Sequence, residues 1–528
     1  MTAVLQRRWA AILAALIAGA GTALAFSPFD ILPGLLGYGL LMMLIDTASG
    51  AQPLRSAFWR GWLAGAAFFL ISTWWISEAF YVDAAAHGWQ APFAVAGLAA
   101  GLGLFWGVAG LAYRALDARG PFRAVVFAGV FCLVEWVRGH ILTGFPWDLA
   151  GESWPAGSAP SQAASLVGAY GLSWITVAAS ASAALALGQD SRRIRLGGVA
   201  VAILAVAGLY GFGYARLAAS VQAAPNAPMV RVVQTGNREE PQYTDARFQE
   251  IVASYLRLTA LPAPRAPAVV VWPEGALPAA LNDVYAPGAW TRTAIAAALQ
   301  PGQTLLTGGF RVAGPPDKPI FYNSLLAVRD EAGVLRIVAD YDKHRLVPFG
   351  EYLPMAKVLA PLGLAKLVGV GDGFATGPAP RPIAPPGLPR VQPLICYEAL
   401  FPGFTRAGAI AAGRPAWIVN VSDDAWFGAS YGPLQHLNIA RYRAIEEGLP
   451  MVRATPTGSS AVIDAYGRIA PGARLDHGAV GVIDRPLPPA LAPTVFERIG
   501  DGGFWIMLFV SAAAMIGRIT QRRRSARE

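Results

Sequence analysis

The sequence predicts a polytopic α-helical membrane domain joined to a large α/β domain. Of its 528 residues, 55% are hydrophobic and only 14% are charged, which is too apolar for an ordinary soluble enzyme. The apolar residues are concentrated in residues 1–217 and near 502–519. The block at 228–490 instead has normal charge and alternating strand and helix patterns, which are typical of a globular domain.

Eight apolar runs each have about the 20 residues that a helix needs to cross a bilayer. The eighth run, at 502–519, follows the α/β block. The other seven form the predicted membrane domain at 1–217 and lie near 9–27, 30–47, 60–80, 91–113, 122–142, 163–187 and 196–216. The sequence therefore predicts eight membrane spans, seven before the block and one after it.

Arginines in the loops between these runs predict how the spans are oriented. The loops "YVDAAAHG" and "GFPWDLAGESWP" contain no Lys or Arg, whereas the alternate loops and both ends of the chain are basic. The basic positions are Arg7, Arg8, Arg55, Arg60, Arg114, Arg119, Arg123, Arg192, Arg193, Arg195, Arg522, Arg523, Arg524 and Arg527. By the positive-inside rule, both termini and the basic tail at 520–528 are cytoplasmic, and the 228–490 domain lies on the outer face. The net charge of +9 reflects these loops and does not indicate nucleic-acid binding.

The α/β block contains a series of predicted strands with helices between some of them. Helical patterns cover 242–260, 289–300 and 433–448. The strand-like segments are "MVRVVQTG", "APAVVVWPEG", "QTLLTGGFRV", "SLLAVRD", "VLRIVADYDK", "VQPLICYE", "AWIVNVSD" and "PMVRATPTGSSAVIDAYGRIA". This pattern predicts a mixed sheet layered with helices.

Three chemically active side chains each follow a predicted strand. Glu274 comes after "VVVWP", Lys343 after "VLRIVADYD" and Cys396 after "VQPLI". Strand ends are where α/β sheets gather their sites. A thiol nucleophile, a carboxylate that accepts its proton and an ammonium that holds an oxyanion would together perform acyl transfer. Spacing alone does not show that the three side chains converge.

The chain has only two cysteines, and they are predicted to lie in different domains. Cys132 falls inside the fifth apolar run, so it is not expected to pair with Cys396. An unpaired cysteine in an exported domain is either a reactive thiol or a small buried hydrophobic residue. The cysteine count leaves both interpretations open.

The segments around these residues resemble a known family. "WPEGALP", "YDKHRLVPFGEYLP" and "ICYEALFP" are similar to the Glu, Lys and Cys segments of the nitrilase superfamily. Together with the predicted spans, "PFGEYLP" resembles the apolipoprotein N-acyltransferase family, the membrane-bound branch of that superfamily. Further segments extend the resemblance over nearly the whole chain: "LAFSPFDILP", "GFPW", "NVSDDAWFG", "QHLNIARYRAIEEGLPMVRATPTG" and "SAVIDAYGRI".

This resemblance implies a nitrilase-like αββα sandwich as the catalytic domain, on the periplasmic side of a bacterial inner membrane. It implies transfer of an acyl chain from a phospholipid, with phosphatidylethanolamine the expected donor, to the α-amino group of a diacylglyceryl apolipoprotein. In the motifs, Glu274 matches the general base, Lys343 the oxyanion holder and Cys396 the nucleophile that carries a thioester. Ping-pong kinetics follow, and no metal or other cofactor is expected.

Supporting residues are also implied by the motifs. Glu351 matches a further acidic residue of the family, with an incidental surface charge as the alternative. Tyr397 and Glu398 flank the nucleophile; Tyr397 could act only through its backbone N–H, and Glu398 could orient neighbours or form a salt bridge. The apolar segment 353–374 is interpreted as an arm at the membrane interface that admits acyl chains, or as a core helix.

Other residues are given structural interpretations. Asn323 is expected to be a turn or packing residue, and His436 a structural histidine rather than a second base. On the fifth run, Glu135 and Arg138 either pair inside the bundle or place Arg138 against a lipid phosphate.

The loop at 420–428 departs from the family pattern. The family often has Asn-Asp before "WFG", whereas this chain has Asp423 and Asp424. Two adjacent carboxylates near a site are expected to raise each other's pKa.

Two other functions compete with acyl transfer to an amine. A membrane-anchored amidase of the nitrilase type would pass the acyl group to water. A membrane scaffold would have no catalysis, which the joint presence of Glu274, Lys343 and Cys396 argues against.

Overall fold

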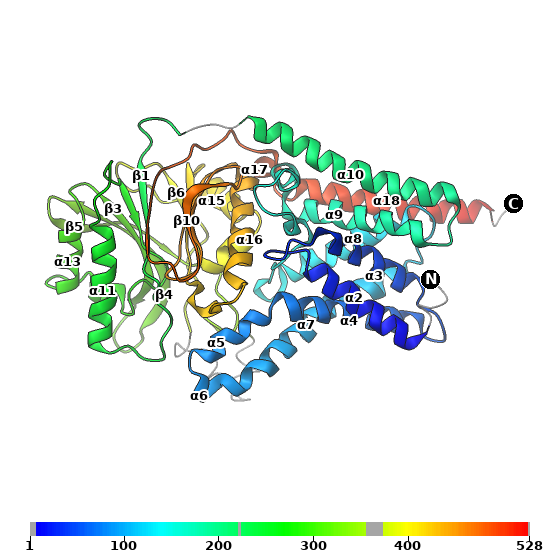
Figure 1. Cartoon of the computed structure of the whole chain (residues 1–528), viewed down its shortest axis with the longest axis horizontal. Coiled ribbons are helices and arrows are strands. Elements are labelled where there is room, and N and C mark those ends of the chain that lie inside the picture. The colour runs from blue at the N-terminus through cyan, green and yellow to red at the C-terminus, as the bar shows by residue number, and fades with distance from the viewer. Residues whose placement is uncertain (1–6, 220–222, 355–372, 526–528) are drawn as a thin grey trace. The chain divides into compact units, whose positions relative to one another are not determined.

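A computed structural model describes residues 7–219, 223–354 and 373–525, and it divides the chain into two compact units (Figure 1). One unit consists of Met1–Ser220 together with Thr494–Glu528, and the other of Val221–Pro493. Most of the predicted arm at 353–374 lies outside the described residues, because 355–372 are not among them. Its proposed role therefore stays a prediction.

The first unit is helical, and each predicted apolar run contains a helix. The helices are α2 (Arg8–Ala23), α3 (Leu36–Asp46), α4 (Pro53–Ser72), α5 (Ser77–Tyr81), α6 (Ala84–His87), α7 (Ala91–Ala115), α8 (Arg123–Arg138), α9 (Ala164–Ala184), α10 (Arg192–Ala218), α17 (Val495–Ile499) and α18 (Gly502–Ser525). Glycines allow α4 and α7 to pack closely: a Cβ added at Gly65 would lie 2.9 Å from the Cα of Gly103. Small residues at such a crossing are typical of membrane helices.

The lengths of these helices do not establish eight spans. In the described part of the chain, three helical stretches are long and apolar enough to cross a membrane: Ala84–Ala115, Pro160–Leu187 and Arg192–Ala218. A fourth is added if Pro53–Ser72 and Trp74–Tyr81, which are bent by 54°, form one broken span. The apolar helices Arg8–Ala23, Leu32–Asp46 and Gly502–Met515 are shorter. The eight-span arrangement therefore remains a prediction.

The second unit contains two β-sheets. The six-stranded sheet has the order β11-β1-β2-β3-β4-β5, and the five-stranded sheet has the order β10-β9-β8-β7-β6. The strands are β1 (Met229–Gln234), β2 (Val269–Val271), β3 (Thr304–Ala313), β4 (Ile320–Glu331), β5 (Val334–Asp342), β6 (Val391–Ile395), β7 (Trp417–Val421), β8 (Met451–Ala454), β9 (Ser460–Ile463), β10 (Ile469–Leu475) and β11 (Gly481–Pro486). Parallel pairing joins β1 to β2 to β3 and β6 to β7 to β8.

Alternating side chains place the sheets back to back. Val230 and Val232 of β1 face a core shared with Val419 and Val421 of β7, whereas the intervening position, Arg231, lies on the opposite face. The outer face of the six-stranded sheet packs on α11 (Asp245–Thr259), α12 (Leu281–Val284) and α13 (Trp290–Ala298). On the other side of the paired sheets, Figure 1 shows α15 (Phe404–Ala412) and α16 (Gly432–Glu447). This unit is therefore a four-layered αββα sandwich.

Most strands and helices of this unit lie where the sequence pattern predicts them, and β11 is a clear exception. Its antiparallel pairing with β1 aligns Arg231 with Asp484, and these side chains form a 2.7 Å ion pair. Because this pairing joins segments about 250 residues apart, local pattern does not indicate it.

Candidate active site

Lys343 lies between two buried carboxylates. It follows β5, and its side chain is 1% exposed. Its Nζ donates to Oε1 of Glu351 at 2.8 Å and to Oε1 of Glu274 at 3.1 Å. Burial alone would lower the pKa of Lys343, but the two glutamates raise it well above its usual range. The lysine is therefore a fixed cation, and the cluster of one cation and two carboxylates has a net charge of −1.

Asn323 of β4 bridges the same two carboxylates. Its Nδ2 donates to Oε1 of Glu274 at 2.6 Å and to Oε1 of Glu351 at 2.7 Å. Its backbone carbonyl also accepts from the N–H of Lys343 at 2.8 Å. Asn323 is thus part of the cluster, and the expectation that it is a turn or packing residue is wrong.

Backbone N–H groups hold the outer oxygens of both glutamates. Oε2 of Glu274 accepts from the N–H of Asp423 at 2.8 Å, and Oε2 of Glu351 accepts from the N–H of Val347 at 2.8 Å. These hydrogen bonds fix the orientation of both carboxylates. Glu351 is 9% exposed, so it is a buried partner of Lys343 and not an incidental surface charge.

Glu274 also requires a glycine on the neighbouring strand. It follows β2, which pairs with β3 in parallel. A Cβ added at Gly308 of β3 would lie 2.6 Å from the Cα of Glu274, closer than real Cβ atoms come to other atoms. The glycine therefore lets the chain carrying Glu274 lie against β3.

Cys396 lies at the end of β6, at the start of a short 3₁₀ helix, Cys396–Leu400. Its φ of +48° falls in the left-handed region, which is uncommon for a residue with a side chain. Burial and the charge of Glu274 raise the pKa of the thiol well above its usual range, although Lys343 opposes this shift. These electrostatic interactions bring Cys396 together with Glu274 and Lys343. A thiol with a raised pKa would need a base to remove its proton before it could act as a nucleophile.

Glu398 connects the segment that carries Cys396 to the segment that carries Lys343. Its Oε2 accepts from the N–H of Ile395 at 2.8 Å. Its Oε1 accepts from the hydroxyl of Tyr341 at 2.8 Å and the N–H of His344 at 2.7 Å. Burial raises the pKa of Glu398 to about 7, although these hydrogen bonds act to lower it. Of the two roles considered, orienting its neighbours is the one that matches these contacts. Its sequence neighbour Tyr397 is buried, and its ring packs on Phe401.

The two adjacent aspartates do not behave as the sequence predicts. Burial alone would raise the pKa of Asp424, but Arg453 holds it well below its usual range. The pKa of Asp423 is raised well above its usual range, chiefly by burial and by the neighbouring Glu239. The expectation that they raise each other's pKa is therefore wrong, because the two side chains face different partners.

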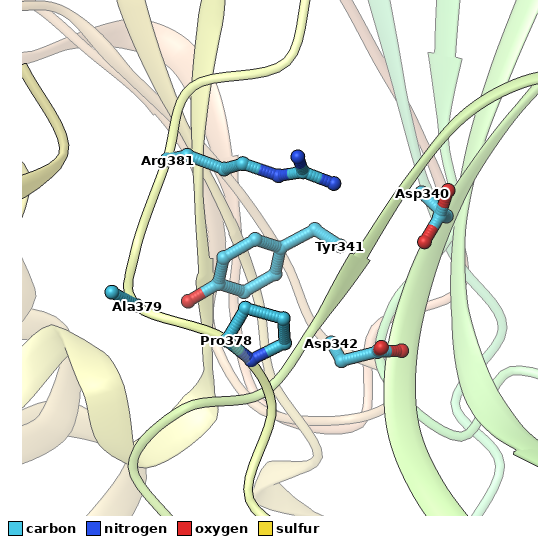
Figure 2. A pocket seen from close by; sticks show the side chains of 6 residues that line it. All are labelled: Asp340, Tyr341, Asp342, Pro378, Ala379 and Arg381. Atoms are coloured by element: carbon cyan, nitrogen blue, oxygen red, sulfur yellow. The ribbon is translucent and has the colours of Figure 1, made fainter. Parts of the chain in front are cut away.

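A small pocket lies beside the end of β5. Figure 2 shows it between the segment carrying Pro378, Ala379 and Arg381 and the strand β5 carrying Asp340, Tyr341 and Asp342. None of the lining residues belongs to the Glu-Lys-Cys set. Within the described residues, no group of three or more His, Cys, Asp and Glu side chains is arranged to hold a metal ion.

In the helical unit, Glu135 and Arg138 form a closed pair. Arg138 Nη2 donates to Oε2 of Glu135 at 2.5 Å, and its Nε donates to Oε1 at 3.1 Å. Its Nη1 donates to the carbonyls of Phe145 and Trp147, and the side chain is 0% exposed. The arginine therefore pairs inside the bundle, and the lipid-phosphate alternative does not match this arrangement.

Comparisons with known proteins find matches to both parts of the chain. The family model for the apolipoprotein N-acyltransferase N-terminal domain matches residues 18–182, and that for carbon-nitrogen hydrolase matches residues 217–492. The chain is 52% identical to an apolipoprotein N-acyltransferase from Caulobacter vibrioides, over 98% of this chain and 97% of that one. It is 37% identical to proteins of the same name from Allorhizobium ampelinum, over 97% and 96%, and from Rhodopseudomonas palustris, over 94% and 93%.

Among solved structures, the chain is similar to an amidase of the nitrilase superfamily from Nesterenkonia AN1. The identity is 16%, and the match covers 51% of this chain and 94% of that one with a TM-score of 0.35.

Proposed function

The chain belongs to the apolipoprotein N-acyltransferase family, enzymes of the carbon-nitrogen hydrolase superfamily, and we propose that it transfers a phospholipid acyl chain to the N-terminus of apolipoproteins. The acceptor is the α-amino group of the S-diacylglyceryl-cysteine, and phosphatidylethanolamine is the proposed donor. The reaction proceeds through a thioester on Cys396. The observation that best supports this proposal is the buried Lys343 held between Glu274 and Glu351, with the charges of Lys343 and Glu274 acting on the Cys396 thiol.

In the first half-reaction, Glu274 acts as general base on Cys396. Its Oε1 already accepts two hydrogen bonds, whereas its Oε2 accepts one from the N–H of Asp423 among the described residues, which leaves a lone pair for the thiol proton. The thiolate attacks the ester carbonyl, and Lys343 with the N–H of Tyr397 stabilises the oxyanion. The tetrahedral intermediate then expels the alcohol of the lysophospholipid, which takes the proton from Glu274 and leaves a thioester.

In the second half-reaction, the amine of the diacylglyceryl-cysteine replaces the lysophospholipid. The amine nitrogen attacks the thioester carbonyl and passes a proton to Glu274. The C–S bond breaks, the amide forms, and the sulfur of Cys396 takes the proton back. Because the first product leaves before the second substrate binds, ping-pong kinetics are expected.

Glu351 and Asn323 support these steps by holding Lys343 and Glu274 in place. Glu351 accepts a hydrogen bond from Lys343, and Asn323 donates to the carboxylates of both Glu274 and Glu351. A fixed cation costs no reorganisation when the oxyanion forms.

We also propose the membrane arrangement that the arginines predict. It has eight spans, cytoplasmic termini, and the 228–490 domain in the periplasm of a bacterial inner membrane. This orientation gives the active site access to outer-leaflet phospholipid and to exported lipoproteins.

The test is multiple-turnover transfer by the full-length protein in phosphatidylethanolamine vesicles containing a synthetic diacylglyceryl-cysteine peptide. We expect the peptide to gain one amide-linked acyl chain and the lipid to become lysophosphatidylethanolamine in equal amounts. Release of free fatty acid without peptide acylation would instead indicate hydrolysis of the amidase type. Neither product, from folded protein, would contradict the proposal.

A further inference from the structure

His436 of α16 contacts the backbone of Cys396. The ring is buried, with 1% of the residue exposed. Its Nε2 lies 3.3 Å from the carbonyl oxygen of Cys396, and its Nδ1 lies 3.0 Å from Oδ1 of Asp424. Both ring nitrogens are thus occupied within the protein. This arrangement is unsuited to a second general base, but it connects the nucleophile to a rigid part of the domain.

Asp424 and Arg453 lie against the other side of the ring. Arg453 Nη2 donates to its two carboxylate oxygens at 2.7 and 2.9 Å, and Ser422 Oγ donates to Oδ1 at 2.8 Å. Arg453 is itself fully buried on β8, where it also donates to the side chain of Asn420. A buried pair held by several hydrogen bonds has little freedom to move.

The backbone at Cys396 needs such support because its conformation is strained. A left-handed φ is unfavourable for a residue with a Cβ, and it persists only where the surroundings fix it. Before the cysteine, Glu398 holds the N–H of Ile395. After it, His436 is placed to hold the carbonyl of Cys396. The two contacts bracket the strained residue.

The proton on the ring must be on Nε2 for this contact to be a hydrogen bond, since a carbonyl oxygen only accepts. Arg453 Nη2 lies 3.2 Å from Nδ1 and can donate to it. In that tautomer the neutral ring donates from Nε2 to Cys396 and accepts at Nδ1 from Arg453, and the same guanidinium nitrogen donates to both oxygens of Asp424, so Arg453 bridges the ring and the carboxylate.

We propose that His436 is a positioning residue, which fixes the backbone of Cys396 through its carbonyl so that the thiol meets both Glu274 and the acyl donor. The inference rests on the proposed function, because it assigns His436 to the step in which Cys396 is acylated. A misplacement of about 1 Å at a reacting group can cost roughly 100-fold in rate.

Two substitutions separate this role from plain packing against Asp424. His436→Gln places an amide N–H near the position of Nε2, within reach of the Cys396 carbonyl. His436→Asn places an amide near the position of Nδ1, so it can contact Asp424 but is too short to reach Cys396. The measured quantity is the single-turnover rate of acyl-enzyme formation from phosphatidylethanolamine, followed by intact mass on the full-length protein.

We expect His436→Ala and His436→Asn to acylate Cys396 roughly 10- to 100-fold more slowly than wild type, and His436→Gln to regain most of that loss. The donor concentration giving half the maximal rate should stay unchanged in all three. Equal rates in the Gln and Asn variants, or a wild-type rate in His436→Ala, would overturn the proposal.

A second readout does not depend on acyl transfer. Alkylation of Cys396 by iodoacetamide at alkaline pH, read by peptide mass, should show the same order, with Gln above Asn. If wild type forms no acyl-enzyme while alkylation keeps this order, the proposed function fails and the positioning role stands. If alkylation is equal in the Gln and Asn variants, the positioning role fails.

Discussion

Each unit of the molecule buries a cluster of opposite charges, and the two clusters are built differently. In the helical unit, Arg138 and Glu135 are matched one to one, and carbonyls accept from the remaining guanidinium nitrogen. In the αββα unit, Lys343 is shared by Glu274 and Glu351, so one carboxylate is in excess. In the first cluster one arginine balances one carboxylate, and each guanidinium nitrogen has an acceptor within the protein. The second has a net negative charge beside a thiol.

The difference indicates how structure can separate a structural ion pair from a reactive one. In the one-to-one pair the arginine balances the charge of the carboxylate and lies against both of its oxygens, so the pair is suited to holding helices together. A cluster with an excess carboxylate can accept one proton and return to balance, which is what a general base does. Burial is similar in the two cases, and therefore burial alone does not distinguish them.

The largest expected effect comes from removing the excess carboxylate. Glu274→Gln keeps the side-chain shape but cannot accept the thiol proton, so the rate of peptide N-acylation should fall by about 10²–10⁴-fold. Glu135→Gln in the other cluster is the matched control, and its folded fraction should keep the wild-type kcat. A wild-type rate in Glu274→Gln would remove the base from the mechanism.

The second effect concerns stability in the helical unit. Arg138→Met leaves Glu135 buried without a partner, which typically costs 3–5 kcal/mol, so we expect a loss of about that size in the free energy of unfolding. The double substitution Glu135→Leu with Arg138→Met should recover most of it, because no charge is left unpaired. Chemical unfolding in detergent measures both. If the double variant is as unstable as the single one, the loss of stability does not come from the unpaired charge of Glu135, and the prediction is contradicted.

A smaller effect is expected from Asn323, which donates to both carboxylates of the reactive cluster. Asn323→Leu removes two hydrogen bonds to charged groups, and acyl-enzyme formation should slow by roughly 10- to 100-fold. Asn282, whose side chain bonds the backbone of Val312 at the surface, offers a control of the same residue type. Equal rates in Asn323→Leu and Asn282→Leu would show that the bridge is dispensable.

The smallest effect is a shift in the pH profile of the Cys396 thiol. Because the charge of Glu274 raises the thiol pKa, Glu274→Gln should lower it, and alkylation by iodoacetamide should begin at lower pH than in wild type. The same variant should therefore gain thiolate while it loses acyl transfer. An alkylation profile shifted to higher pH would contradict the electrostatic account.

The sequence draws attention to three candidate side chains because each follows a strand, but only the family resemblance indicates that they act together. Glu274, Lys343 and Cys396 all lie within a few residues of a strand end, which is where functional side chains cluster in layered α/β folds. The family resemblance, which the full-length relatives confirm, rests on the same segments.

The sequence does not indicate that Asn323 bridges the two glutamates or that His436 contacts Cys396, for physical reasons. Asn323 lies inside β4, and only the register between β4 and β5 brings it to Lys343. His436 lies on a helix that was predicted correctly, but α16 buries polar side chains where the usual pattern predicts apolar ones. The sequence feature that indicates a special role for this helix is its high content of polar residues without a clear apolar stripe.

The most direct test of the account is the intact mass of the full-length protein after incubation with phosphatidylethanolamine. Wild type should gain the mass of one acyl chain, hydroxylamine should release it, and peptide mapping should place it on Cys396. Cys396→Ser should lack the hydroxylamine-labile adduct, and Glu274→Gln should form it far more slowly. Folded wild-type protein that gains no acyl chain, or that carries it elsewhere, would contradict the claim that this cluster generates an acyl-enzyme.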